Sequence, residues 1–249
     1  GGNPIRYGSE FELSMTNYVV TGTIVEIDRE GSTLQTATES FVVQLDLDRR
    51  TANRINTGDG FQLGDSELVM FDTVTVYPRP GNDQLDRRAI VGVNAEVLAD
   101  GPTPLLGEQP VRPGSGLTVR TQSYDLTGDV IRVGSLEEPG TPEARIATVE
   151  LSGISPERAD ALSVGASEET RDLETATIVD KTSRPAQQRV VVDGEVRTSE
   201  DPLNRDVTLA VELNVRLLDD GSIRFRGEQL EIGQEIAFDF GRVTVNGRL

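Results

Sequence analysis

Two carboxylates near the start of this sequence come closest to forming a chemical site. Asp46 and Asp48 alternate at the end of an apolar run, and Arg49 and Arg50 follow directly. Side chains two residues apart on a strand share a face, so both carboxylates could bind one divalent cation such as Mg²⁺ or Ca²⁺. The alternative is a solvated strand end. The sequence predicts Asp46 and Asp48 as a candidate metal site and leaves both interpretations open.

Other acidic segments are weaker candidates. Asp219-Asp220-Gly221 resembles part of a calcium loop, but the other spaced ligands are missing, and a hairpin turn is the favoured interpretation. Glu26, Asp28 and Glu30 could hold surface cations such as Na⁺, K⁺, Mg²⁺ or Ca²⁺ loosely. We therefore expect no bound cofactor.

The composition excludes several chemistries. The chain has 249 residues and contains no Cys, His or Trp, which excludes thiolate nucleophiles, disulfides, Cys/His zinc sites and Ser-His-Asp triads. A carboxylate pair could still hydrolyse glycosides, although no Trp is present to stack on sugars. Lys181, the single Lys, could act as a Schiff-base or general-base lysine, but its polar surroundings predict an exposed side chain.

The charge of the chain argues against nucleic acid as a partner. There are 42 acidic and 24 basic residues, with a net charge of −18, and such a chain repels phosphate backbones. The scarcity of Lys has two compatible explanations, an Arg-biased, high-GC genome and a salt-adapted surface. Because the acidic excess accompanies it, we expect a haloarchaeon or a similarly salt-adapted source. No apolar window is long enough to span a membrane, so we expect membrane contact only through an anchor outside this sequence.

Internal similarity predicts a tandem repeat. Residues 43–45 match residues 149–151 at an offset of 106, and residues 91–101 match residues 211–221 at an offset of 120. At that second offset Gly107-Glu108-Gln109 recurs as Gly227-Glu228-Gln229. Residues 5–27 align with residues 111–133 without gaps, as the tail of a further unit. The predicted domains are residues 1–40 (an N-terminal strand segment), 41–138 and 139–249 (two repeat units).

Alternation of apolar and polar residues predicts strands through both units. Short helices are expected only at residues 48–55 and 155–162, the second with Ser155 as N-cap and Pro156 at the first helical position. Residues 134–143 are predicted to be a linker, and Asp193-Gly194 a hairpin turn. The predicted fold is all-β, with tandem small β-barrel or sandwich-like units that each contain one short helix.

This pattern resembles a membrane-anchored family of unknown function in bacteria and archaea. The residues that carry the resemblance are Asp100-Gly101, Gly107, Val111 to Gly114, Leu117, Tyr124, Gly128 and Val130 to Val133. The family has an N-terminal membrane helix followed by an extracytoplasmic β domain. That helix is absent here, and Val243 stands where the second unit should repeat Tyr124. The resemblance implies an extracytoplasmic, cell-surface or membrane-anchored location and no particular reaction.

The sequence therefore favours a non-enzymatic structural or interaction module of the cell envelope of a halophilic archaeon. The alternative is a carboxylate- or metal-dependent hydrolase or a carbohydrate-binding module. Expected partners are proteins, or a second copy of the chain. The unmatched strand pair at residues 5–27 needs a partner, because unpaired strand edges are templates for another strand. Three partners stay open: the chain's own barrels, an upstream unit outside this sequence, or a neighbouring subunit in a head-to-tail oligomer.

Overall fold

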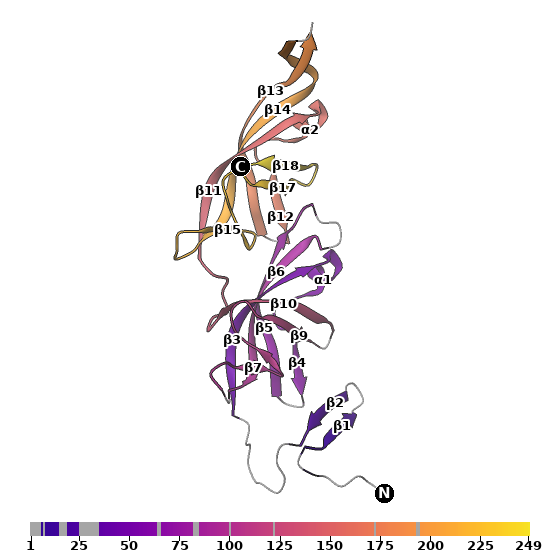
Figure 1. The fold of residues 1–249 in the computed structure, drawn as a ribbon, viewed down its shortest axis with the longest axis vertical. Helices are drawn as coiled ribbons and strands as arrows, with labels where there is room; N and C mark the ends of the chain where they lie inside the picture. The colour runs from indigo at the N-terminus through magenta and orange to yellow at the C-terminus, as the bar shows by residue number, and fades with distance from the viewer. Residues whose placement is uncertain are drawn as a thin grey trace. The chain divides into compact units, whose positions relative to one another are not determined.

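The computed structural model describes residues 6, 8–14, 19–24, 35–63, 66–81, 85–99, 101–121, 123–171, 173–192 and 195–249. The chain forms two compact units, Gly1–Gln35 and Thr36–Leu249. Within the described residues the regular structure is antiparallel β-sheet apart from two short helices, so the predicted all-β, barrel-like fold is confirmed. The larger unit contains two curled sheets, which Figure 1 shows as separate fans of strands.

The first sheet, together with its helix, we call the first repeat. Its strand order is β4-β5-β6-β3-β10-β9, and a short hairpin, β7–β8, pairs with β6. The elements are β3 (Thr36–Leu47), α1 (Arg49–Arg54), β4 (Gly60–Leu63), β5 (Ser66–Pro78), β6 (Arg87–Leu98), β7 (Leu105–Leu106), β8 (Gln109–Pro110), β9 (Gly116–Arg120) and β10 (Asp125–Val133).

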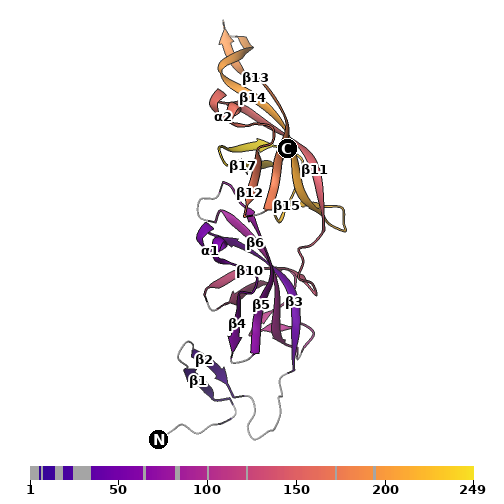
Figure 2. The same ribbon diagram turned by 180° about the vertical axis from the view of Figure 1, so that it is seen from behind.

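The second sheet, the second repeat, has the same strand order element for element, β12-β13-β14-β11-β18-β17, with β15–β16 attached to β14. Its elements are β11 (Thr141–Ile154), α2 (Pro156–Ala161), β12 (Ser167–Thr170), β13 (Leu173–Val192), β14 (Glu195–Leu217), β15 (Ile223–Phe225), β16 (Glu228–Gln229), β17 (Glu235–Asp239) and β18 (Thr244–Arg248). In both views the paired ends of β13 and β14 extend past α2 (Figures 1 and 2).

Alternating residues of each sheet build its core. Phe41, Val43 and Leu45 of β3 are buried in the first repeat, and Val149 and Leu151 of β11 occupy the corresponding positions in the second. Burying a large aliphatic or aromatic side chain contributes about 1.5–3 kcal/mol, so these two separate cores stabilise the two sheets.

Both predicted helices are confirmed, and each has a local cause. Asp48 caps α1 and Ser155 caps α2, where Pro156 occupies the first helical position. Each helix ends after six residues because Ile55 and Leu162 adopt extended backbone angles. Both residues are fully buried, which anchors the helix ends to the two cores.

The strand pairing corrects the repeat alignment. Val43 pairs with Val91, whereas Val149 pairs with Leu209. Leu209 therefore corresponds to Val91, and the predicted offset of 120 is two residues too long for these strands. A shift of two keeps every side chain on the same face, so identities alone could not reveal the error.

Three other predictions need correction. β11 begins at Thr141, inside the predicted linker 134–143, and the predicted 40/41 boundary falls within β3. Predicted strands at residues 175–180 and 189–192 are one strand, β13, whose register shifts after Pro185. The predicted turn at Asp193-Gly194 lies outside the described residues.

One hairpin occurs three times. β9–β10 and β17–β18, the closing hairpins, end the two sheets, and β1 (Glu10–Ser14) and β2 (Val19–Thr23) form the front hairpin in the smaller unit. The pairs Phe11↔Gly22, Leu117↔Gly128 and Ile236↔Gly247 occupy the same place in all three. The same backbone bond precedes each first strand: Gly8 N to Ile24 O, Gly114 N to Val130 O and Gly233 N to Leu249 O, at 2.7, 2.8 and 2.9 Å.

Candidate functional site

The two carboxylates predicted to bind a cation have separate protein partners. Asp48 accepts hydrogen bonds from the Thr51 hydroxyl at 2.7 Å and from the backbone N–H groups of Thr51 and Arg50, and these bonds lower the pKa of its carboxyl. Asp46 instead faces the guanidinium groups of Arg88 and Arg79, at 2.9 and 3.0 Å. The described residues contain no group of three or more acidic side chains suited to a metal. A cation at Asp46 and Asp48 remains a prediction.

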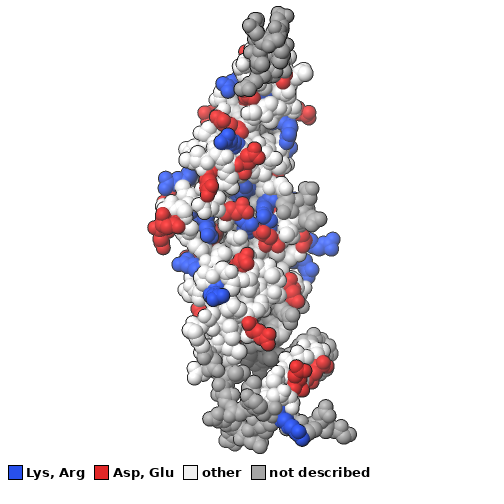
Figure 3. Space-filling model, in the orientation of Figure 1, with Lys and Arg blue, Asp and Glu red and all other residues white. Residues whose placement is uncertain are grey.

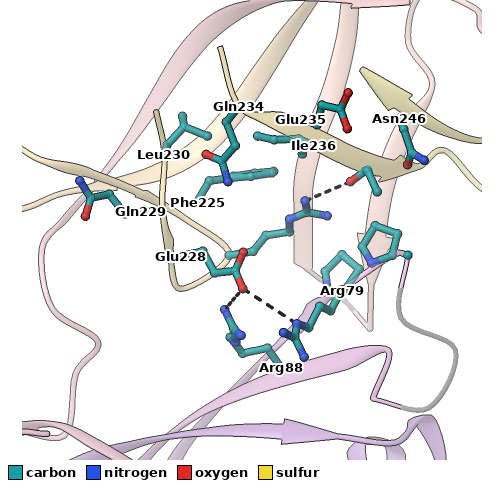
Figure 4. Close-up of a pocket in the computed structure, with 15 residues that line it drawn as sticks. Arg79, Arg88, Phe225, Glu228, Gln229, Leu230, Gln234, Glu235, Ile236 and Asn246 are labelled. Carbon is teal, nitrogen blue, oxygen red and sulfur yellow. Dashed lines mark hydrogen bonds and ion pairs between the residues drawn. The ribbon is translucent and has the colours of Figure 1, made fainter. Parts of the chain in front are cut away.

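Asp46 belongs to a charged network beside a cavity of about 410 Å³ between the two repeats. Figure 4 shows Glu228 of β16 pointing toward both Arg88 and Arg79 of the first repeat. The Arg88 Nη1 to Glu228 distance is 2.8 Å, and the Arg88 side chain is 6% exposed. Burial disfavours its charge, but Asp46 and Glu228 outweigh that effect and raise the pKa of Arg88. The network therefore joins the two repeats electrostatically.

Arg226, which lines the same cavity, belongs to a second ion pair. Glu168 of β12 is buried and accepts bonds from Arg226 Nη1 at 3.0 and 3.2 Å, from the Thr175 hydroxyl at 2.7 Å and from the Asp239 N–H at 2.9 Å. The Arg226 guanidinium also lies 4.5 Å from the ring centre of Phe225. Burial lowers the pKa of Arg226, and Glu168 only partly opposes this. Four satisfied contacts keep this buried carboxylate compatible with the core.

A buried tyrosine also joins the repeats. The Tyr77 hydroxyl of β5 donates to Glu138 at 2.5 Å, and Arg216 of β14 lies 3.4 Å from the same carboxylate. Glu138 stands in the segment between β10 and β11. Burial raises the pKa of Glu138 against the opposing effects of Tyr77 and Arg216, and burial together with Glu138 raises the pKa of Tyr77. A cavity of about 350 Å³ beside this triad is lined by Tyr77, Glu143, Glu174 and Arg216.

The two helices end on different cations. Arg171 of the second repeat donates to the carbonyl groups of Ala52 and Ile55 at the end of α1, the latter at 2.7 Å. The corresponding carbonyl groups of α2 accept from Lys181 of the same repeat, with Leu162 O at 2.6 Å. The prediction that Lys181 is exposed is therefore wrong: it is half-buried because its ammonium satisfies a helix end.

Arg171 and Arg226 share an unusual backbone. They are the described non-glycine residues with left-handed φ, at 55° and 53°. The strand pairing places Arg226 at the position of Gly107 and Arg171 at the position of Gly64 in the first repeat. A non-glycine residue there costs roughly 1 kcal/mol relative to glycine. Arg171 bonds to the first repeat at the end of α1, whereas Arg226 lines the cavity between the repeats and bonds within the second repeat.

Sequence reasoning missed this contact. The signal was present as two glycine-to-arginine differences between equivalent turns, but the alignment offset of 120 matched Gly107 with Gly227 and hid one of them. Glu138, Glu168 and Tyr77 carried no signal, because their role depends on burial between segments far apart in the chain.

The chemistry of this contact is ion pairing and hydrogen bonding between repeats. Comparison with known proteins adds no relative, because no family model, no curated protein and no solved structure matches the chain. None of the helices in the described ranges is long and apolar enough to cross a membrane.

Proposed function

We propose that the protein is a non-enzymatic structural or interaction module of the cell envelope of a halophilic archaeon. The observation that carries the proposal is the contact between the repeats, where charged side chains bind one repeat to the next. Arg171 adopts a strained backbone angle where it reaches the first repeat, which is expected where a sequence maintains an assembly of repeats.

Two further arguments support the location and the source. The Gly-centred motifs resemble a membrane-anchored family with an extracytoplasmic β domain. The net charge of −18 with a single Lys suits a surface exposed to concentrated salt.

Cell fractionation tests the location. The gene, with its natural upstream sequence and a C-terminal tag, is expressed in a halophilic archaeal host, and membrane, surface and soluble fractions are probed for the tag. Recovery in the membrane or surface fraction is expected. Recovery in the soluble cytoplasmic fraction alone overturns the envelope proposal.

A second experiment tests the structural role. The intact chain is expected to unfold with coupled transitions of its two repeats, measured by hydrogen exchange across a urea series. The double variant Arg171→Gly/Glu228→Gln is expected to separate them, because it removes two contacts between the repeats and leaves both cores intact. Identical coupling in both proteins would contradict the proposal, and specific binding of glycans by the intact chain would favour the carbohydrate-binding alternative.

A further inference from the structure

The front hairpin presents an apolar residue whose counterparts are core residues. Phe11 is 39% exposed, whereas Leu117 is fully buried and Ile236 is 6% exposed at the same place in the closing hairpins. Leu117 packs into the core of the first repeat and Ile236 into that of the second. A single exposed apolar side chain is common on protein surfaces, so the distinctive feature of Phe11 is that both of its counterparts are buried in a core.

The outer edge of β2 is also a pairing edge in the other two copies of the hairpin. In the first repeat β10 pairs with β3, with Val130 opposite Val43, and in the second β18 pairs with β11, with Arg248 opposite Glu150. β2 is the counterpart of β10 and β18. Within the described residues β1 and β2 form a two-stranded sheet by themselves. A hairpin of two strands is only marginally stable in water, which favours an added strand.

Gly22 is an independent sign of the same contact. A Cβ on Gly128 would lie 2.2 Å from the Gln44 carbonyl oxygen of β3, and one on Gly247 would lie 2.3 Å from Val149 Cγ1 of β11. Glycine is therefore required in both closing hairpins because the first strand of the sheet passes over it. In the front hairpin a Cβ on Gly22 would meet only the ring of Phe11, at 2.9 Å. Glycine weakens a strand, and no described contact within the front hairpin requires one at position 22. Its presence there fits a position that another strand approaches closely.

From these observations we infer that the front hairpin is a docking element that closes a further β-unit of this repeat type. The partner is a curled sheet that presents a strand like β3, with alternating apolar residues such as Phe41, Val43 and Leu45, beside β2. Backbone hydrogen bonds along β2 would provide the contact, and the core beneath Phe11 would provide the specificity. In both repeats the closing hairpin follows the sheet that it closes within one polypeptide, so the partner is a unit that precedes the front hairpin in its own polypeptide. The inference deepens the proposed interaction role and does not depend on cellular location.

A fusion protein tests this inference directly. Residue 5 corresponds to residue 111, so the body of a unit, residues 36–110, can be joined directly before residues 5–249. In this fusion the front hairpin has a unit to close. Hydrogen exchange of the β2 amides, Val19–Thr23, is measured in the fusion and in the original chain. Exchange is expected to slow by more than about tenfold in the fusion, since closed sheets open far more rarely than isolated hairpins.

Two variants serve as controls. Gly22→Val is expected to keep the hairpin in the original chain, because β-branched residues favour strands and the Phe11 ring can move aside, but to abolish the added protection in the fusion. Phe11→Asp is expected to behave in the same way, since a charge is tolerated on the surface and not in a core. Each variant is first compared with the parent in the original chain, so a failure of the hairpin itself is visible.

The concentration dependence of exchange in the original chain tests whether a second copy provides the partner instead. Protection of the β2 amides that rises with concentration would place the partner on a second copy and overturn the assignment to one polypeptide. Unchanged exchange in the fusion, or equal protection with Gly22→Val, overturns the inference. These outcomes leave the fractionation experiment unaffected, so the two proposals fail independently.

Discussion

At the scale of single residues, the two repeats use different cations for the same task. The last carbonyl groups of a helix lack intrahelical partners, and a cation placed there satisfies them and interacts favourably with the helix dipole. The end of α1 depends on Arg171 from the other repeat, whereas the end of α2 depends on Lys181 from its own. The first repeat is therefore the one whose helix depends on its neighbour.

Arg171 provides a test of this dependence. Both Arg171→Ala and Arg171→Gly lose the two hydrogen bonds to the helix carbonyl groups, and a typical hydrogen bond contributes about 0.5–1.5 kcal/mol. Ala retains the cost of the left-handed backbone, and Gly removes it, so Arg171→Ala should lower the free energy of unfolding by roughly 1 kcal/mol more than Arg171→Gly. Urea denaturation measures both, with the exposed Arg145→Ala as a control expected to change stability by less than about 0.5 kcal/mol. Equal stability of the two Arg171 variants would contradict the strain argument.

Tyr77 makes stability depend on pH. Its pKa is raised above 10.0 by burial and by Glu138, so the folded state keeps the phenol proton that the unfolded state releases near pH 10. The stabilisation is present in full below pH 10 and is lost as pH rises above it, by up to about 1.4 kcal/mol per pH unit for each such group.

Tyr77→Phe should therefore be less stable at neutral pH, by about 2 kcal/mol, because Glu138 loses a donor while buried. Above pH 10 its free energy of unfolding should fall less steeply than that of the parent. The free energy of unfolding of Tyr77→Phe should still decrease somewhat with pH, because burial also raises the pKa of Tyr124. Urea denaturation at a series of pH values measures the slopes, and parallel curves would show that Tyr77 does not cause the loss.

At the scale of elements, the sequence predicted features that depend on neighbouring residues. The helix at Ser155-Pro156 follows from a cap and a proline, and the strands follow from alternation over a few residues. The register of β14 and the burial of Glu138 depend on partners up to 78 positions away, and nothing local specifies them. The candidate site was missed for the same reason, because its charges come from both repeats.

Substitution of glycines in the closing hairpins tests whether β3 and β11 pass as closely over them as the further inference assumes. Gly128→Ala should destabilise by about 2–3 kcal/mol, because its Cβ would meet a backbone oxygen of β3 that cannot rotate away. Gly247→Ala should cost less, about 1–2 kcal/mol, because the nearest atom belongs to the Val149 side chain. Thermal unfolding measures both against Gly116→Ala, a β9 position with open space that should be nearly neutral. A Gly128→Ala variant as stable as Gly116→Ala would show that β3 does not pass closely over this glycine.

At the scale of the whole molecule, net charge opposes the local ion pairs. Acidic and basic side chains are interspersed on the face in Figure 3, so short-range attraction and long-range repulsion coexist. The repulsion arises from the net charge of −18 and acts over the full Debye length, whereas the pairs act over a few ångström. Added salt therefore removes the repulsion before it weakens buried pairs such as Arg226–Glu168.

This difference in range predicts the response to salt. Raising KCl from low concentration to about 1 M shortens the Debye length from tens of ångström to about 3 Å, and the melting temperature should rise steeply over that interval. Above about 1 M, a further rise in the melting temperature would require hydrated cations held specifically by surface carboxylates. The melting temperatures in KCl and in tetramethylammonium chloride should therefore agree below about 1 M and diverge above it. Calorimetry at matched pH measures both series. A melting temperature that stays flat in KCl would remove the argument for a salt-adapted source, and a rise that persists after acidic surface residues are replaced by their amides would assign the effect to something other than charge.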